Sequence, residues 1–343
     1  MVSANDLAFI AAPMVNQSDF PFRALTRKYG ATLAYTQMLS PDKLLYDQDY
    51  LEFHQRDLMQ NENNHGRPVV VQLCGNDPEV VVSAGKKLQT YCDAIDLNLG
   101  CPQEHAREGH YGGYLLGRKD WHLVQNIVSS MSKSLAVPVS AKIRLCQNTS
   151  DTVILAESLE ASGASWVTLH ARHVSARRRR QGAADLSQVK QLKERLRIPV
   201  ISNGNVRKWD DLIENFEYTG ADGCMVGETL LGNPCLFANL VPDPVRISLE
   251  YLEICKRHPE TVSLHAIQAH VRHYIEYQCV RRPWFQKFRK SLSLCHDIED
   301  VERLLIAKVS RWRGKAGQVL EEASDTEEED DDATGVPMLP RNI

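Results

Sequence analysis

Short, nearly continuous runs of apolar and β-branched residues recur through the first two-thirds of the chain. Runs of this kind are typical of parallel strands that are buried on both faces of a sheet. They lie at residues 9–12, 33–36, 69–73, 94–97, 137–143, 166–169, 199–202 and 223–226. The pattern therefore predicts eight short parallel strands.

Segments in which apolar positions follow helical spacing separate most of these runs. They lie at residues 77–88, 120–135, 151–161, 185–196 and 210–218. Asp77 followed by Pro78 is typical of a helix start, and Gly220 would end the last of these helices. Alternating strands and helices predict an α/β fold, a (β/α)8 TIM barrel. The alternative is an open doubly wound sheet, which we disfavour because no Gly-x-Gly-x-x-Gly loop follows the first run.

The pattern changes after Pro242, where Pro242, Asp243 and Pro244 read as a linker. Residues 246–318 look helical and contain no convincing strand. We therefore predict a barrel domain over residues 1–241 and a smaller all-helical domain over residues 242–318. An acidic tail over residues 319–343, poor in apolar positions, is expected to be disordered.

Charge is distributed unevenly along the chain. The net charge is −4, yet residues 321–343 carry −8, so the remainder carries +4. Residues 246–318 hold 14 Lys and Arg against 8 Asp and Glu, a net of +6. A surplus of this size could be only a solvated face. We favour a phosphate-backbone contact, with Arg281, Arg282, Lys287 and Arg289 next to the aromatic residues Trp284 and Phe285.

Other function classes find little support in the composition. Nine cysteines are scattered without a Cys-x-x-Cys pair, so we expect no metal site. Free thiols favour a reducing compartment, the cytoplasm or the nucleus. No apolar run is long enough to span a membrane, and the first residues lack the basic and apolar pattern of a secretory signal. We expect a monomer.

Polar residues follow the predicted strands at the ends where a barrel of this type carries its chemistry. Pro13, Met14 and Val15 follow the first strand, Gln72 ends the third, and Asn98 and Cys101 follow the fourth. The later strands end in Lys142, Arg144, His170, Arg172, Asn203, Gly204, Asn205, Gly227 and Glu228. Glycine-containing loops after the last two strands are where such barrels commonly hold a phosphate through backbone N–H groups.

Three of these residues have a structural alternative to a functional role. Lys142 could form an ion pair with a carboxylate such as that of Asp96, although a lysine in an apolar strand at the active end favours function. His170 could be a hydrogen-bonded core histidine. Cys101 could be an inert buried thiol, but glycine before it and proline after it let the thiol project into the barrel mouth.

Taken in order, these residues resemble the tRNA-dihydrouridine synthase family over about residues 8–240. The resemblance rests on residues 12–15 (APMV), 96–103 (DLNLGCPQ), 141–144 (AKIR), 169–172 (LHAR) and 202–206 (SNGNV), among which the Asn-x-Gly-Cys-Pro block is highly specific. Residues 110–112 and 231–234 look like the eukaryotic branch that modifies positions 16 and 17 of the tRNA D-loop.

The resemblance implies an FMN-binding barrel, NADPH as reductant and a helical domain that holds tRNA. It implies that Cys101 is the proton donor, and that Pro13, Met14, Val15, Gln72, Asn98, Lys142 and His170 lie against the flavin ring. The FMN phosphate would lie at Asn203, Gly204, Asn205, Gly227 and Glu228. Many family members carry arginine where this chain has Glu228, so another cation or backbone N–H groups must balance that phosphate.

The resemblance implies that hydride reaches C6 of an extruded uracil and that Cys101 protonates C5. Arg144, Arg172 and the basic loop residues Arg178 and Arg179 are expected to contact tRNA. Two alternatives remain open at this point. One is a small-molecule FMN oxidoreductase on the same barrel, similar to a dihydroorotate-oxidising enzyme. The other is a tRNA-binding protein that has lost catalysis.

Overall fold

The computed structural model describes residues 2–61, 65–175 and 182–314. Eight parallel strands form a closed barrel in chain order, because the first strand pairs with both the second and the eighth. The strands are β1 Phe9–Ala11, β2 Leu33–Leu39, β3 Val69–Leu73, β4 Ala94–Leu99, β5 Val139–Leu145, β6 Trp166–His173, β7 Val200–Asn203 and β8 Gly223–Val226. Closure confirms the predicted barrel and rules out the open doubly wound sheet.

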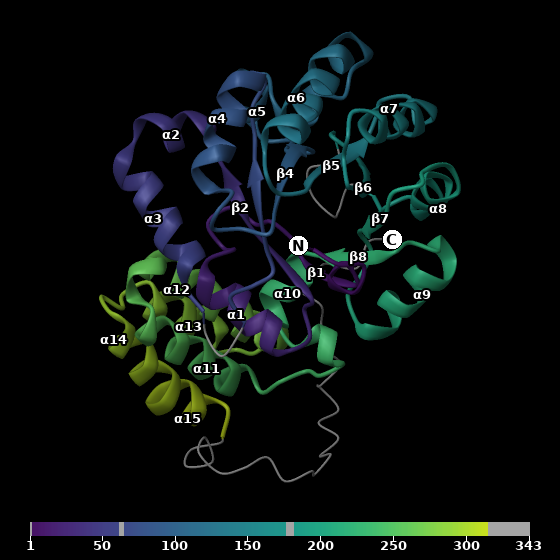
Figure 1. Cartoon of the computed structure of the whole chain (residues 1–343). Helices are drawn as coiled ribbons and strands as arrows, with labels where there is room; N and C mark the ends of the chain where they lie inside the picture. The colour runs from purple at the N-terminus through teal and green to yellow at the C-terminus, as the bar shows by residue number, and fades with distance from the viewer. Residues whose placement is uncertain (1, 62–64, 176–181, 315–343) are drawn as a thin grey trace.

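Helices cover the outside of the barrel between successive strands (Figure 1). They are α1 Phe20–Lys28, α2 Pro41–Tyr46, α3 Gln48–Met59, α4 Pro78–Leu88, α5 Glu104–Glu108, α6 Trp121–Ser134, α7 Ser150–Ala161, α8 Leu186–Arg195, α9 Trp209–Thr219 and α10 Glu228–Gly232. The predicted Asp77 cap is present, since its carboxylate accepts from the N–H groups of Glu79 and Val80. Gly220 ends α9 with a φ of +64°.

Several strands run further than their apolar runs predict. β2 continues to Leu39, β4 to Leu99 and β6 to His173, and β5 is shifted by two residues toward its C-terminal end. The added residues mix polar and apolar side chains, and the polar ones remain in the ladder, as the pairing of Asn98 with Lys142 shows. Apolar content marks only the part of a strand inside the core, whereas backbone pairing continues to the barrel mouth.

The C-terminal segment is helical, as predicted. It forms α11 Pro244–Arg257, α12 Leu264–Cys279, α13 Phe285–Leu292, α14 Ile298–Arg303, a π-helical segment Leu304–Val309 and α15 Ser310–Trp312. These helices pack together on the side of the barrel that carries α1 and α10 (Figure 1). The predicted acidic tail, residues 319–343, lies outside the described residues.

Two apolar clusters surround the barrel interior. One joins the strands to the helices from α2 to α8, and the other joins α1 and the barrel wall to α11–α14. The second cluster includes Phe20, Phe22, Tyr251 and Tyr274. Burial of large aromatic side chains at this boundary fixes the helical segment against the barrel, because each ring removes a large apolar area from water.

Candidate active site

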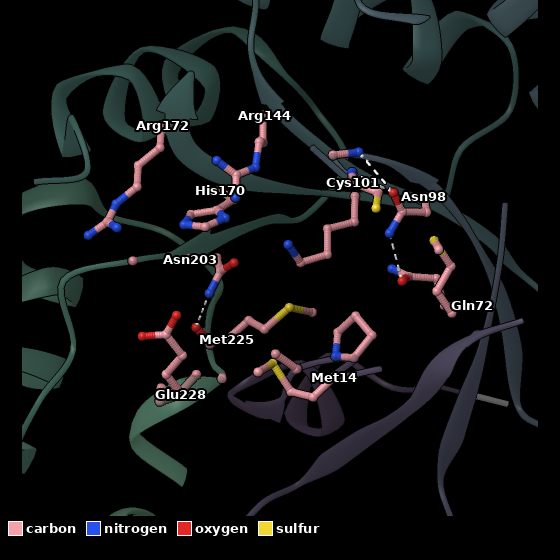
Figure 2. Close-up of a pocket in the computed structure, with 18 of the residues that line it drawn as sticks. Met14, Gln72, Asn98, Cys101, Arg144, His170, Arg172, Asn203, Met225 and Glu228 are labelled. Carbon is pink, nitrogen blue, oxygen red and sulfur yellow. Dashed lines mark hydrogen bonds between the residues drawn. The ribbon is translucent and has the colours of Figure 1, made fainter. Parts of the chain in front are cut away.

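A cavity of about 370 Å³ opens at the C-terminal ends of the strands. Figure 2 shows its side chains converging from several strands of the barrel. All the residues that the resemblance places around the flavin line it, together with Arg144 and Arg172. Those residues are Pro13, Met14, Val15, Gln72, Asn98, Cys101, Lys142, His170, Asn203, Gly204, Asn205, Gly227 and Glu228.

One side of the cavity is apolar and carries three methionines. Met14 follows β1, Met38 lies near the end of β2, and Met225 lies in β8. The loop bearing Met14 is held by Ser18, whose hydroxyl accepts from the Met14 N–H at 2.8 Å and lies 3.3 Å from the Ala12 carbonyl oxygen. A Cβ added at Gly227 would lie 3.1 Å from the Met14 sulfur, so glycine there lets Met14 approach. Polarizable thioethers suit a flat aromatic ligand.

Sequence reasoning missed Met38 and Met225 as lining residues. Met225 sits in a short apolar strand, and its inward direction was available from strand alternation in residues 223–226. Met38 lies beyond the apolar run at residues 33–36, in the extension of β2 that follows the polar Gln37. Only the pairing of Met38 with Gln72 across the ladder places it at the mouth.

A chain of hydrogen bonds fixes the amide side chains of the site. Ser140 Oγ and Gln72 Nε2 donate to the two oxygens of Asp96, at 2.6 and 2.9 Å. Asn98 Nδ2 then donates to Gln72 Oε1 at 2.8 Å. Asn98 Oδ1 in turn accepts from the N–H of Cys101 at 2.9 Å. The buried carboxylate therefore sets the direction of both amides and, through them, the loop that carries the thiol.

Lys142 is the ammonium at the centre of the cavity wall. Its Nζ makes no hydrogen bond or ion pair with any described residue, so the pairing with Asp96 considered from the sequence is not formed as a direct contact. Burial and, to a smaller extent, the Arg144 charge lower the pKa of Lys142 to about 8, although the Asp96 charge acts in the opposite direction. Burial also raises the pKa of Asp96 to about 6. An ammonium in this setting is available to a bound anion.

Two arginines, Arg144 and Arg172, and the carboxylate of Glu228 lie at the end of the cavity away from Gln72 (Figure 2). Arg144 Nη1 donates to the His173 carbonyl at 3.0 Å. Burial and, to a smaller extent, the Arg172 charge lower the pKa of Arg144 to about 10, although the Glu228 charge acts in the opposite direction. Burial also lowers the pKa of Arg172, and the negative charge of Glu228 acts to raise that pKa. With two guanidinium groups against one carboxylate, this end keeps a net positive charge despite Glu228.

The loops after β7 and β8 present backbone N–H groups to the cavity. Gly204 has a φ of +134° and Asn205 a φ of +60°, and the Asn205 side chain holds the turn by bonding both the N–H and the carbonyl of Ala184 at 2.8 Å. Asn203 Nδ2 donates to the Met225 carbonyl at 2.7 Å. The N–H groups of Gly204, Asn205 and Gly227 donate to no described residue. Such a set of free amides is suited to an anion.

Cys101 is buried at the edge of the cavity, beside the loop at residues 110–115. Its carbonyl accepts from the Gly113 N–H at 3.1 Å, and a Cβ added at Gly112 would lie 2.9 Å from the Cys101 Cβ. Burial raises the pKa of the thiol above its usual range, so the thiol stays protonated at neutral pH. All nine cysteines are free and buried, and Cys101 is the one that lines this cavity.

The basic residues of the helical domain lie apart from this cavity. Arg281, Lys287 and Arg289 are exposed and Arg282 is half-buried, and none of them lines it. Lys287 Nζ lies 5.1 Å from the ring centroid of Trp312, in a cation–π contact. Arg178 and Arg179 lie outside the described residues. In the described part of the chain, no group of three His, Cys, Asp or Glu is arranged to hold a metal ion, and no helix has the length and apolar character to cross a membrane.

Comparison with known proteins gives one family. The sequence model described as Dihydrouridine synthase (Dus) matches residues 10–333. The Mus musculus protein named tRNA-dihydrouridine(16/17) synthase, NAD(P)(+)-like, is 38% identical over 262 residues, covering 76% of this chain and 54% of that protein. The Saccharomyces cerevisiae protein named tRNA-dihydrouridine(16/17) synthase, NAD(P)(+), is 36% identical over 272 residues, covering 76% and 63%. The chain thus spans a little over half the length of these relatives.

A more distant relative and a solved structure extend the comparison. The Homo sapiens protein named tRNA-dihydrouridine(20a/20b) synthase, NAD(P)+-like, is 34% identical over 257 residues, covering 74% of this chain and 78% of that protein. A solved structure titled 2-naphthoyl-CoA reductase in complex with 2-naphthoyl-CoA matches with a TM-score of 0.54 and 10% identity, over 66% of this chain and 49% of that chain. At that identity the likeness concerns the barrel fold alone.

Proposed function

The chain belongs to the dihydrouridine synthase family, and we propose that it reduces the C5–C6 double bond of uridine in the tRNA D-loop, at positions 16 and 17, with FMN as cofactor and NADPH as reductant. One observation carries the proposal. A protonated thiol, Cys101, and an ammonium with no partner among the described residues, Lys142, face the same cavity at the mouth of a closed barrel. A proton donor and a counter-charge for an anion are the two groups that this reduction needs from the protein.

The cavity has the groups that FMN would require. The methionine side, Met14, Met38 and Met225, would lie against the flat ring. The amides of Gln72 and Asn98, whose orientation Asp96 fixes, would meet the polar edge of the ring, with Lys142 beside them. The free N–H groups of residues 204, 205 and 227 would hold the phosphate.

The cation that balances the phosphate would be Arg172. It lines the cavity next to the phosphate loops, and its buried Nε atom has no hydrogen-bond partner among the described residues. Glu228 acts electrostatically on both this guanidinium and that of Arg144, so its negative charge is offset by two cations. Arg172 would thus take over the charge balance that arginine at position 228 would provide in many family members.

Bound FMN, reduced by NADPH, would supply the hydride for C6 of the uracil. Lys142 would hold a positive charge against the electron-rich ring, which the low-dielectric wall strengthens. Cys101 would then give its proton to C5, since its raised pKa keeps the thiol intact until a strong base forms beside it. The hydrogen bond from the Cys101 N–H to Asn98 keeps the thiol at the cavity edge while it acts.

A uracil in a stacked loop cannot reach the bottom of this cavity, so tRNA would bind with the target base extruded. The exposed basic residues of the helical domain, Arg281, Lys287 and Arg289 with the half-buried Arg282, would contribute phosphate contacts that do not depend on the base. His170 would lie beside the ring and Arg144 beside the extruded nucleotide.

The test uses the purified chain and unmodified tRNA. We expect a yellow protein whose released cofactor has the mass of FMN, NADPH-dependent bleaching of that colour, and dihydrouridine at D-loop positions 16 and 17 by mapping of the tRNA. Flavin without any tRNA reduction would point to a small-molecule oxidoreductase on the same barrel. RNA binding without flavin would point to a tRNA-binding protein that has lost catalysis.

A further inference from the structure

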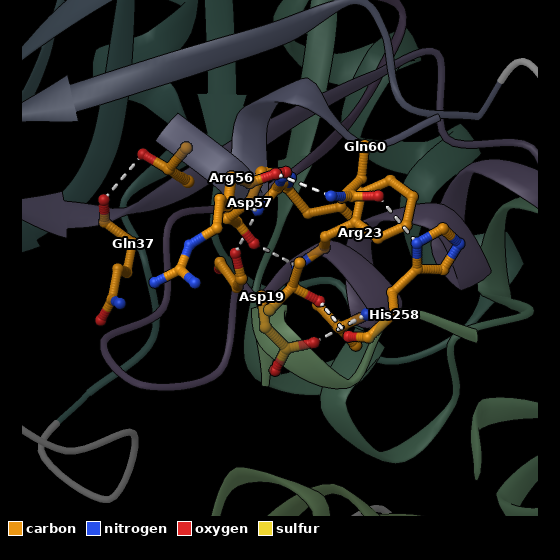
Figure 3. Close-up of polar contacts among 12 residues, drawn as sticks. Asp19, Arg23, Gln37, Arg56, Asp57, Gln60 and His258 are labelled. Atoms are coloured by element: carbon orange, nitrogen blue, oxygen red, sulfur yellow. Dashed lines mark hydrogen bonds and ion pairs between the residues drawn. The ribbon is translucent and has the colours of Figure 1, made fainter. Parts of the chain in front are cut away.

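A second cavity of about 320 Å³ lies between the barrel and the helical domain. Its walls come from the loop after β1, the end of β2, the helix α3, and the segment that leads into α12. Phe53 and His54 line it from α3, and His265 lines it from α12. Figure 3 shows polar groups of its barrel wall, with Asp19, Arg23, Gln37 and Asp57 labelled.

Only a thin wall separates this cavity from the candidate active site. Asn16 and Gln37 line the second cavity, whereas their chain neighbours Gln17 and Met38 line the first. The Asn16 N–H donates to Gln37 Oε1 at 2.8 Å, which joins the loop to the end of β2. The two cavities are therefore neighbours, with the loop after β1 and the end of β2 as a shared wall.

The walls of the second cavity are fixed by contacts between distant segments. Arg23 Nη1 pairs with Asp57 at 2.9 Å and also donates to the Ser18 carbonyl at 2.7 Å. On the helical side, His258 Nδ1 and Gln60 Oε1 lie 2.9 Å apart, and Thr261 Oγ1 donates to the His258 carbonyl at 2.8 Å. The cavity is therefore part of the built interface between barrel and helical domain.

His54 is the residue in this cavity that calls for a ligand. Its side chain is 3% exposed, and it forms ring contacts with Tyr50 and Phe53 but no hydrogen bond to any described residue. Burial, together with the nearby charge of Arg23, lowers its pKa to about 4. The imidazole is thus neutral at neutral pH and offers one donor and one acceptor. Its ring nitrogens are therefore open to a polar ligand in the cavity, which would supply the hydrogen bonds that no described residue makes.

The charges around the cavity disfavour a phosphate. Asp19 and Asp57 are both in the wall, and Arg23 is already paired with Asp57. Asp19 is committed to the Phe22 N–H and lies 3.1 Å from His270 Nε2. What remains is a half-buried aromatic ring, Phe53, beside the neutral donor and acceptor of His54 and the side-chain amide of Gln37. This combination suits a flat, neutral, hydrogen-bonding ring, such as a nucleobase.

We propose that this second cavity binds a nucleobase next to the target uridine, stacked on Phe53 and hydrogen-bonded to His54. The proposal rests on the proposed function, because extrusion of one base takes the stacking partner from its neighbours. A neighbouring base that enters a pocket one wall away compensates for that loss and holds the RNA backbone across the barrel mouth. The volume falls at the lower end of the range of about 300–1,000 Å³ that is usual for ligand pockets.

The test combines a protein change with an RNA change and measures equilibrium binding of the flavin-loaded protein. Short D-loop hairpins carry an abasic site on the 5′ or the 3′ side of the target uridine. For the wild-type protein, one of the two abasic hairpins should bind about 5- to 150-fold more weakly than the intact hairpin, since stacking contributes about 1–3 kcal/mol per base. Phe53→Ala should weaken binding of the intact hairpin by a similar factor, and should add no further loss with that abasic hairpin.

Two further variants keep the test independent of folding. His265→Ala changes an exposed residue on the opposite wall and should give a smaller loss that also disappears with the abasic hairpin. Tyr46→Ala removes an aromatic ring that is 82% exposed and lines neither cavity, and should bind every hairpin as the wild type does. Melting temperature and flavin absorbance confirm that each variant is intact.

The proposal is overturned if Phe53→Ala weakens binding of that abasic hairpin by the same factor as it weakens binding of the intact hairpin. It is also overturned if the wild-type protein binds all the hairpins with equal affinity. A weaker response to NADPH in Phe53→Ala with unchanged RNA binding would assign the cavity to the reductant and would also overturn it. A different result would show that the proposed function itself is wrong. In that case the flavin-loaded wild type leaves intact tRNA unreduced, while the binding measurements still report whether a base occupies the cavity.

Discussion

The ion pair between Arg23 and Asp57 offers a sharp test of how the site is supported. Both side chains are buried, at 2% and 5% exposure, and the pair joins α1 to α3. Arg23 also donates to the Ser18 carbonyl in the loop that carries Met14, and Asp57 accepts from the Phe20 N–H at 2.7 Å. Arg23→Met keeps most of the apolar stem of the side chain and removes the charge with its hydrogen bonds.

Removal of one partner from a buried pair leaves the other charge without compensation. That situation typically costs about 3–5 kcal/mol of the free energy of unfolding. With an unfolding entropy of about 2.1 cal/mol/K per residue, a chain of this size should lose about 4–8 °C in melting temperature. Asp57→Asn should cost a similar amount, because it leaves the guanidinium unpaired. The double variant should lose clearly less than the sum of the two single losses.

The pH dependence has a definite sign. Burial raises the pKa of Asp57, and the Arg23 charge and hydrogen bond oppose that rise. In Arg23→Met the opposition is gone, so the folded-state pKa rises further above the unfolded value of about 3.9. When a carboxyl has a higher pKa in the folded state than in the unfolded state, its protonated form stabilises the folded protein. This stabilisation is complete at a pH below the unfolded-state pKa, and it is lost as the pH rises through the folded-state pKa. The deficit of Arg23→Met should therefore grow as pH rises, and the double variant should not show this growth.

The assay is thermal unfolding of wild type, both single variants and the double variant, followed by circular dichroism from pH 5 to pH 8. A deficit of Arg23→Met that is the same at every pH would refute the electrostatic account. Strict additivity of the two single losses would refute it as well, because the side chains would then contribute independently.

The remaining predictions concern the proposed chemistry. Cys101→Ala should keep the flavin and its reduction by NADPH but lose at least about 100-fold in uridine reduction, and a normal rate of dihydrouridine formation would mean that another acid serves. Lys142 is protonated below its pKa of about 8, so flavin reduction should slow as pH rises through that value, and Lys142→Met should be slower and lose this dependence. Joint replacement of Arg281, Arg282, Lys287 and Arg289 by Ala should weaken tRNA binding and lower the slope of log affinity against log salt by up to about 3, with the flavin spectrum unchanged. Identical slopes would show that this surface serves solubility alone.

The sequence by itself determined the barrel and the order of its site residues. Eight apolar runs with helical segments between them leave few arrangements, because parallel strands buried on both faces need helices outside them. The runs do not give the strand ends to the residue, but their order and direction were enough to assign Gln72, Asn98, Lys142 and His170 to one mouth. The run at residues 41–59 gave no clear signal, since two short helices, α2 and α3, break the helical period at Asp47.

Tertiary structure alone decided how those residues act on one another. The direction of the Gln72 amide depends on Asp96 below it and Asn98 beside it, and a sequence does not give which atom of an amide meets which partner. The second cavity shows the same limit more strongly. Its lining residues lie near residues 16–19, 36–37, 53–57 and 261–266, and no spacing along the chain relates them. Packing of the C-terminal helices against α1 brings them together, because burial of apolar surface acts between segments regardless of their separation in sequence.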